Sequence, residues 1–282
     1  MLEKNLKLII QELRALDYNS YLCATFCEKK DFHKVAAILL LWAELKKISD
    51  ITDEDMVGMI RLAWWKENLQ DIFLNNKSKN HHLLDVILSF KNEIDFELLL
   101  QAFEDFEKDF SEEKKFQNKA QLENYIFKTQ EVFLLIILKI LNFSDENLVK
   151  KIAKNLALIS FNFELLKKIK NEDEKIVRFF YPEFFEELNI EIKSWKKNSD
   201  EGNLLLVVKH LVSQINLAAE EIKKIEKLLP KNLKNLIVKK DLVQILLQDL
   251  RRNSYNIFAS KISAKSFFVK IKFLIKIMSR SA

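Results

Sequence analysis

Glycine and proline are almost absent from this chain, since each occurs only twice among 282 residues. Average usage is about 7% for glycine and about 5% for proline. Proteins built from β-strands use these residues in turns and bulges, so the chain has little from which to build a sheet. Long stretches rich in Leu, Lys, Glu and Ile instead place apolar residues three or four positions apart, as amphipathic helices do. The sequence therefore predicts an all-α fold.

The length of the chain is sufficient for a large core within one domain. We expect a single helical bundle over residues 1–258, followed by a distinct segment over residues 259–282. The expected helices cover residues 3–16, 19–28, 31–49, 53–75, 81–91, 96–110, 120–142, 146–170, 203–228, 233–256 and 264–279.

The most informative stretch covers residues 43–73, AELKKISDITDEDMVGMIRLAWWKENLQDIF, with one of the two glycines and two of the four tryptophans. Thr52 followed by Asp55 resembles a capping box, so we expect a helix to begin there. On that helix the pattern G-x-I-R-x-x-W-W runs from Gly58 through Arg61 to the tryptophan pair. The pattern resembles the signature of the squalene/phytoene synthase family. The resemblance extends from about residue 18 to residue 258 and implies an isoprenoid synthase fold, in which Arg61 contacts the substrate.

In that family a DDxxD element on the preceding helix holds magnesium ions. Here the corresponding residues read KKISD, from Lys46 to Asp50, so only Asp50 offers a carboxylate. Mg²⁺ takes oxygen ligands, and the ammonium group of Lys46 has no lone pair to offer a metal. Lys46 could instead contact a diphosphate directly as a point charge. The alternative is that Glu44, Lys46, Lys47 and Asp50 form the solvated face of a helix.

Two further segments resemble the acidic elements of the family. Residues 99–110, LLQAFEDFEKDF, place Asp105 and Asp109 on one helical face. The second element is weaker, because its helix reads ALISFNFELLKKIK and is followed by the strip RFFYP, with lysines where acids are expected. If the chain is an enzyme, the resemblance implies catalytic roles for Asp50, Asp105 and Asp109, metal binding by these three and Glu164, and substrate binding by Lys46, Arg61, Asn162, Arg178 and Tyr181.

Bulky side chains occupy a position where synthases often place Ala and Gly along the tunnel for the prenyl chain. Residues 131–141 read EVFLLIILKIL. Large side chains at helix crossings narrow or fill a central cavity. Whether a lipid-sized cavity remains is open at this point.

Other kinds of site are poorly supported. Cys23 and Cys27 lack a second cysteine pair and are expected to be core thiols in a reducing compartment. The four histidines lack metal-ligand spacing, and glycines only at positions 58 and 202 exclude a Gly-rich phosphate loop. The net charge of +5 alone does not support nucleic-acid binding. Residues 1–16 resemble an amphipathic helix and not a targeting signal, which favours the cytoplasm.

The positive charge is concentrated at the C-terminus. Residues 259–282 contain six Lys and Arg and no acid, although the whole chain carries only +5. Apolar residues alternate with these cations at helical spacing, which is typical of a helix that lies on an anionic membrane or binds an acidic partner. The alternative is a last helix docked on the domain with its lysines in water. The residues expected to make membrane or partner contact are Lys265, Phe267, Phe268, Lys270, Lys272 and Lys276.

Within the family, the chain most resembles the branch that includes the mitochondrial respiratory complex I assembly factor, because Leu41 to Leu45, LWAEL, parallels the F-N-x-E-L of that branch. The first hypothesis is a divergent, non-catalytic member that acts through protein or lipid contacts and needs no cofactor. The second is a Mg²⁺-dependent head-to-head prenyltransferase with unusual ligands. The third is a helical scaffold. Expected partners are a prenyl diphosphate or other lipid, an anionic membrane on whose inner face the protein is peripheral, and an assembly partner protein, but no nucleic acid.

Overall fold

The described part of the chain consists of helices joined by turns, and no strand occurs within it. This confirms the all-α class. The proximity of Cα atoms divides the chain into two compact units. The first comprises residues 1–114, 128–153 and 229–236, and the second comprises 115–127, 154–228 and 237–282. The computed structural model describes residues 2–51, 54–108, 110, 116–143, 145–190, 201–229 and 237–281, without the side chains of 50, 51, 174, 175, 201, 267 and 279–281.

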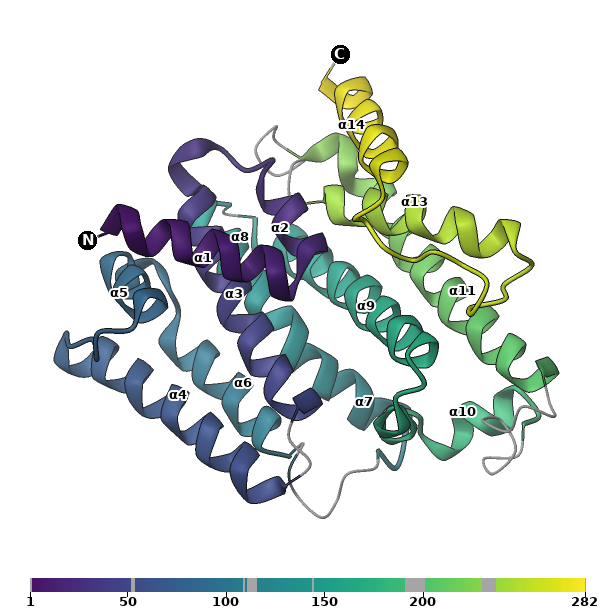
Figure 1. Cartoon of the computed structure of the whole chain (residues 1–282), viewed down its shortest axis with the longest axis horizontal. Helices are drawn as coiled ribbons and strands as arrows, with labels where there is room; N and C mark the ends of the chain where they lie inside the picture. The colour runs from purple at the N-terminus through teal and green to yellow at the C-terminus, as the bar shows by residue number, and fades with distance from the viewer. Residues whose placement is uncertain are drawn as a thin grey trace. The chain divides into compact units, whose positions relative to one another are not determined.

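The helices of the first unit surround α3 (Figure 1). This helix contacts α1, α2, α4, α5 and α8, so it is apolar on nearly every side and not amphipathic. Residues 35–43 of α3 are all buried. The bounds in this unit are α1 Leu2–Leu16, α2 Tyr18–Ala24, α3 Lys29–Ile51, α4 Asp55–Asn75, α5 His82–Ser89, a 3₁₀ turn Lys91–Glu93, α6 Phe96–Lys108 and α8 Val132–Ile140.

Helix α4 positions the G-x-I-R-x-x-W-W pattern. It begins at Asp55 with Glu54 as the N-cap residue, whose side chain makes no capping hydrogen bond. The expected capping residue, Thr52, lies outside the described residues. The helix ends at Asn76, which adopts the left-handed conformation (φ 54°) that asparagine tolerates. Leu62, Trp65, Leu69 and Ile72 are buried, so the pattern runs along the edge of the buried face.

The expected helix over 120–142 is interrupted. Asn118 caps α7 by accepting a hydrogen bond from the backbone N–H of Gln121 (3.0 Å), and a π-helical turn over Phe127–Glu131 then separates α7 (Lys119–Ile126) from α8. The expectation of one continuous helix was therefore wrong. Thr129, Gln130 and Glu131 are buried polar residues at this turn, and inserted π-turns re-aim side chains at such positions.

The second unit contains most of α9 (Glu146–Lys170), which begins in the first unit. Lys170 at its end donates hydrogen bonds to the backbone carbonyls of Ile257 (3.2 Å), Phe258 (3.3 Å) and Ser260, which holds the loop after α13. Helix α13 contacts both α11 and α14. The other elements are a 3₁₀ helix Glu174–Phe179, α10 Pro182–Glu187, α11 Glu201–Ile225, a 3₁₀ turn Glu226–Leu228, α13 Val238–Arg252 and α14 Phe267–Ser281.

Both cysteines are reduced, as expected for core thiols. Cys23 is buried and Cys27 is half-buried. Burial, assisted by the nearby Asp31 carboxylate, raises the pKa of the Cys27 thiol to about 12. The thiol therefore stays protonated near neutral pH and is a poor nucleophile.

Candidate functional site

The ammonium group of Lys46, one of the predicted site residues on α3, has two partners. Its Nζ lies 3.9 Å from Oδ2 of Asp17 and 4.4 Å from the centre of the Trp42 ring. The acid and the aromatic face both attract the ammonium group and hold it on this side of α3. The side chain of Asp50, one turn further along α3, lies outside the described residues.

Asp105 is the clearest departure from a metal site. Its side chain is buried on α6, and Nζ of Lys108 lies 2.7 Å from Oδ1 while Nζ of Lys128 lies 3.2 Å from Oδ2. Two lysines therefore neutralise the one carboxylate, and a magnesium ion would have to displace both to bind it. Asp109, its expected partner, lies outside the described residues. Within the described part of the chain, no three His, Cys, Asp or Glu side chains are grouped to hold a metal ion.

Aromatic side chains fill the space between α3, α6 and α8. The Trp42 ring stacks on Phe133 with centroids 5.6 Å apart and planes 4° apart, and Phe106 packs edge-on against Phe133 at 6.4 Å. All three side chains are buried. The bulky residues expected to narrow a prenyl tunnel thus pack in the core at this point.

The site residues predicted on α9 and after it belong to the second unit. Asn162 donates a hydrogen bond to the carbonyl of Leu158 on its own helix (2.8 Å), and Glu164 pairs with Lys167 (2.7 Å). The Arg178 guanidinium lies 4.7 Å from the centre of the Phe179 ring. Tyr181 is buried, and burial raises the pKa of its hydroxyl. Their predicted grouping with residues of α3 and α6 remains a prediction.

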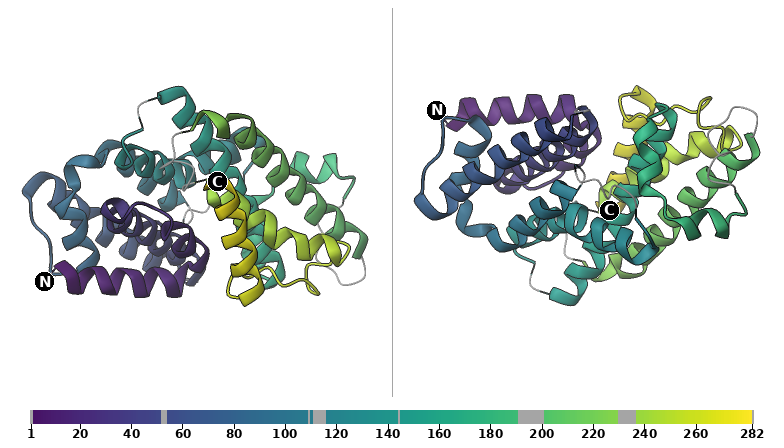
Figure 2. Two further views of the ribbon diagram at one scale, coloured as in Figure 1. Left: turned by 90° about the horizontal axis from the view of Figure 1, so that it is seen from above. Right: turned by 90° about the horizontal axis from the view of Figure 1, so that it is seen from below.

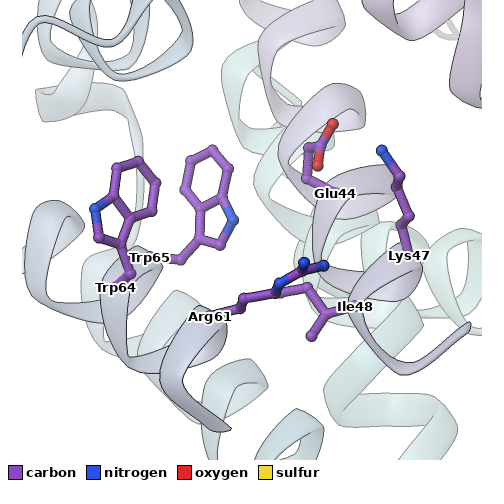
Figure 3. A pocket seen from close by; sticks show the side chains of 6 residues that line it. All are labelled: Glu44, Lys47, Ile48, Arg61, Trp64 and Trp65. Carbon is purple, nitrogen blue, oxygen red and sulfur yellow. The ribbon is translucent and has the colours of Figure 1, made fainter. Parts of the chain in front are cut away.

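A pocket of about 170 Å³ lies between α3 and α4 (Figure 3). Arg61 extends from α4 toward α3, and the two tryptophans of α4 lie across the pocket from Glu44 and Lys47 of α3. The side chain of Arg61 is exposed, although it lines the pocket. Trp65 is buried, whereas Trp64 is 41% exposed. The lining residues are Glu44, Lys47, Ile48, Arg61, Trp64 and Trp65.

The pocket lies between one stretch of α3 and one stretch of α4, and the lining residues have the same spacing in both. Glu44, Lys47 and Ile48 have the spacing i, i+3, i+4 on α3, and the residues of α4 from Arg61 repeat that spacing. Residues spaced in this way share one helical face. From the sequence, Glu44 and Lys47 were predicted only to lie on a solvated face of their helix. The spacing that they share with Arg61 and the two tryptophans is the pattern from which contact between the two helices could have been predicted.

Aromatic contacts and burial set the electrostatics of the pocket. Trp64 and Trp65 pack edge to face at 5.0 Å, and the ring of His81 packs against both at 5.6 and 5.3 Å. Burial raises the pKa of the Glu44 carboxyl, an effect that the Lys47 charge opposes. Burial, followed by the charge of His82, lowers the pKa of His81. Burial therefore favours the neutral form of the His81 imidazole and the neutral form of the Glu44 carboxyl.

Helix α14, at the yellow end of the chain, packs beside α13 (Figure 2). Phe273 and Ile277 are buried, so the helix is anchored where it packs on α13. Phe268 is 74% exposed and Met278 is 71% exposed. The exposed apolar face consists of Phe268, Ile271, Leu274, Ile275 and Met278, and exposed Lys272 and Lys276 lie beside it. The side chain of Phe267 lies outside the described residues.

Within the residues that the structure describes, no helix is both long enough and apolar enough to cross a membrane.

Comparison with known proteins places the chain among relatives of two kinds. The model of the family described as squalene/phytoene synthase matches residues 13–267. NADH dehydrogenase (ubiquinone) complex I, assembly factor 6, from Homo sapiens is 27% identical over 137 residues, which are 48% of this chain and 41% of that protein. The Bos taurus protein of the same name is 26% identical over 137 residues. The match thus spans less than half the length of these curated relatives.

Solved structures resemble the whole chain. A dehydrosqualene synthase in complex with a ligand superposes with a TM-score of 0.75 at 17% identity, covering 99% of this chain and 97% of that one. The squalene synthase HpnC from Alicyclobacillus acidocaldarius superposes with a TM-score of 0.71 at 13% identity, covering 90% and 96%. At these identities the likeness establishes the isoprenoid synthase fold.

Proposed function

The chain belongs to the squalene/phytoene synthase family, and from that premise we propose that it is a divergent, non-catalytic member that acts through contacts with proteins and lipids. It keeps the scaffold of a prenyl synthase, and among the residues that the structure describes no group of three His, Cys, Asp or Glu side chains could hold the metal ions of a prenyl diphosphate. It needs no metal cofactor for this role.

The surroundings of Asp105 are the observation that supports this proposal most strongly. A diphosphate with its magnesium ions needs several converging carboxylates to offset the charge removed from water. Asp105 is instead buried and paired with Lys108 and Lys128, and Lys46 replaces an acid on α3. The stacked Trp42 and Phe133 rings further support a core that is packed where synthases hold substrate.

The relatives suggest the process in which these contacts are used. Two of them are named as assembly factors of NADH dehydrogenase (ubiquinone) complex I. We infer a role in the assembly of a respiratory complex, with an assembly intermediate as the protein partner. Arg61 and Trp64 of the family motif are exposed, which supports their use in such a contact.

Helix α14 supports the lipid contact. Its exposed apolar face and its lysines are the combination that binds an anionic membrane from one side. We infer that the protein is cytoplasmic and peripheral on the inner face of a membrane. A prenyl diphosphate or another lipid is then a bound ligand at most, and not a substrate.

The test is pyrophosphate release by the purified full chain with Mg²⁺ and farnesyl or geranylgeranyl diphosphate. Release should not exceed background, while an active squalene synthase assayed in parallel releases pyrophosphate. Sustained Mg²⁺-dependent release that disappears in a folded Asp50→Ala or Asp105→Ala variant would overturn the proposal and favour a head-to-head prenyltransferase. Circular dichroism of both variants separates lost chemistry from lost structure.

A further inference from the structure

Helix α4 presents an unusual amount of apolar surface next to the pocket. Met56 is 75% exposed and Ile60 is 63% exposed, and Met59 and Trp64 are also exposed. These four residues follow the spacing of one helical face, which we call the α4 face. Trp64 belongs both to the α4 face and to the pocket wall, so the two form one continuous surface.

The size of the pocket limits what can fill it. Sites for whole small molecules measure about 300–1,000 Å³ and bury most of the ligand. At about 170 Å³ this pocket has room for one large side chain and not for a prenyl diphosphate. An occupant that also covers the α4 face must therefore be larger than the pocket and insert only an anchor.

The charged residues at the rim of the pocket indicate which charge the bound group should carry. Arg61 and Lys47 both line the pocket, and among the described residues neither forms an ion pair. Glu44 is the one acid in the lining, and it is half-buried. These two cations form no salt bridge among the described residues, and beside exposed Trp and Met side chains they are complementary to a carboxylate next to an apolar anchor.

A membrane fits this surface less well than a polypeptide. Exposed Glu54 and Asp55 stand at the start of α4, beside Met56, and Glu67 lies further along the same side. A uniformly anionic lipid surface would face these acids and be repelled by them, and the sequence of α14, in contrast, contains no acid. A helix can instead place its carboxylate opposite Arg61 and Lys47 and other side chains opposite the acids. Tryptophan and arginine are the side chains that most often dominate protein interfaces, and methionine adapts to varied partners.

We propose that the α4 face and the adjoining pocket dock an acidic amphipathic helix of a partner protein. One aromatic or aliphatic side chain of that helix fills the pocket between α3 and α4. A carboxylate one turn away pairs with Arg61 and Lys47. The proposal rests on the proposed function, since it assigns the surface through which the protein contact is made. It corresponds to the helix-in-groove mode of peptide recognition.

The experiment is a selection of helical peptides displayed on phage, panned on the full chain, with recovered peptides then measured in solution by fluorescence anisotropy. Arg61→Glu reverses the rim charge, and Ile60→Glu places a charge on the α4 face. The matched controls are Arg252→Glu on α13 and Leu217→Glu on α11, which are also exposed. Circular dichroism should show that all four variants fold.

Recovered peptides should carry an aromatic or aliphatic anchor with Asp or Glu one turn away. Each surface variant should weaken their binding by about tenfold or more, as expected for anchor contacts. Each control should change it by about twofold at most. A photo-crosslinking residue at position 60, but not at position 217, should capture the bound peptide.

Three results would overturn the proposal: no enriched peptide, enriched peptides that are basic, or equal binding to the parent chain and both surface variants. A self-association that Ile60→Glu alone abolishes would also overturn it, because a second copy would then cover this face. Pyrophosphate release is measured on the parent chain without peptide, so its result is obtained independently of the selection. A failed selection without pyrophosphate release therefore removes the docking site and leaves the proposed function in place.

Discussion

The ring of Phe110 lies directly against the Cα atom of Gly58. A Cβ atom added at position 58 would lie 2.2 Å from Cε1 of Phe110, far inside van der Waals contact. Gly58 is buried on α4, and Phe110 follows the end of α6. The glycine of the family pattern thus lets these two elements approach closely.

Gly58→Ala should destabilise the fold. Alanine favours a helix over glycine by about 1 kcal/mol, but overpacking costs about 1–3 kcal/mol, so we expect a net loss. Urea unfolding would measure it, and Phe110→Leu should recover part of the loss in the double variant. Gly202→Ala, at an exposed position in α11, is the control and should be neutral or stabilising. Greater stability of Gly58→Ala would mean that the ring moves aside at little cost.

Replacing each of the two lysines around Asp105 should lower the stability of the fold by different amounts. Lys128 is 25% exposed and Lys108 is 61% exposed. Lys128→Met leaves the buried carboxylate without its less exposed partner and should cost about 1–3 kcal/mol. Lys108→Met should cost about 1 kcal/mol or less, because solvent screens that pair. Denaturant midpoints compare the two variants, and equal losses would contradict this account.

Glu44→Gln should stabilise the protein near neutral pH. Burial raises the pKa of Glu44, so the folded chain holds its proton at a pH where the unfolded chain has lost it. The contribution of this carboxyl to the free energy of unfolding is therefore most favourable below pH 4.5, its usual pKa. That contribution falls as the pH rises through the higher pKa of the folded state. The gain of Glu44→Gln should appear at pH 7 and vanish at pH 4. Exposed Glu67→Gln is the control, and a gain that is independent of pH would argue against this cause.

Helix α14 should bind vesicles that contain phosphatidylserine more tightly than vesicles of phosphatidylcholine alone. Each lysine near an anionic surface contributes about 1 kcal/mol, so Lys272→Glu with Lys276→Glu should weaken binding by about tenfold or more. Phe268→Ser with Met278→Ser should also weaken it, through lost apolar burial. Binding should fall at high salt, because the Debye length shrinks from about 10 Å at 0.1 M to about 3 Å at 1 M.

Point variants suit this measurement better than removal of the tail. Phe273 and Ile277 are buried, so a chain that ends at Ala259 loses core packing as well as the exposed face. Lys150→Glu with Lys154→Glu, on exposed positions of α9, is the matched control. Equal co-sedimentation of all variants, or no response to salt, would mean that α14 is only the last packed helix.

Local pattern was enough to predict the helices and the family. The spacing of apolar residues places the buried side chains of each helix, as for α9, whose expected bounds match Glu146–Lys170. The interruption between α7 and α8 could not be predicted, because a π-helical turn leaves the apolar spacing of its flanks unchanged. The pattern from Gly58 to Trp65 likewise predicted the family, because its residue types and spacing are read within one helix.

The sequence by itself determined the all-α class, the family, the loss of acids on α3 and the basic C-terminus, since each depends on residue types and short spacings. Only the tertiary structure decided that Lys128 pairs with Asp105, that Glu44 and Lys47 share a pocket with Arg61, and that α14 buries one apolar face while exposing another. The physical reason is that helical periodicity defines faces within one helix. Which faces meet depends on how distant helices pack, and that packing brings together residues that no local pattern relates.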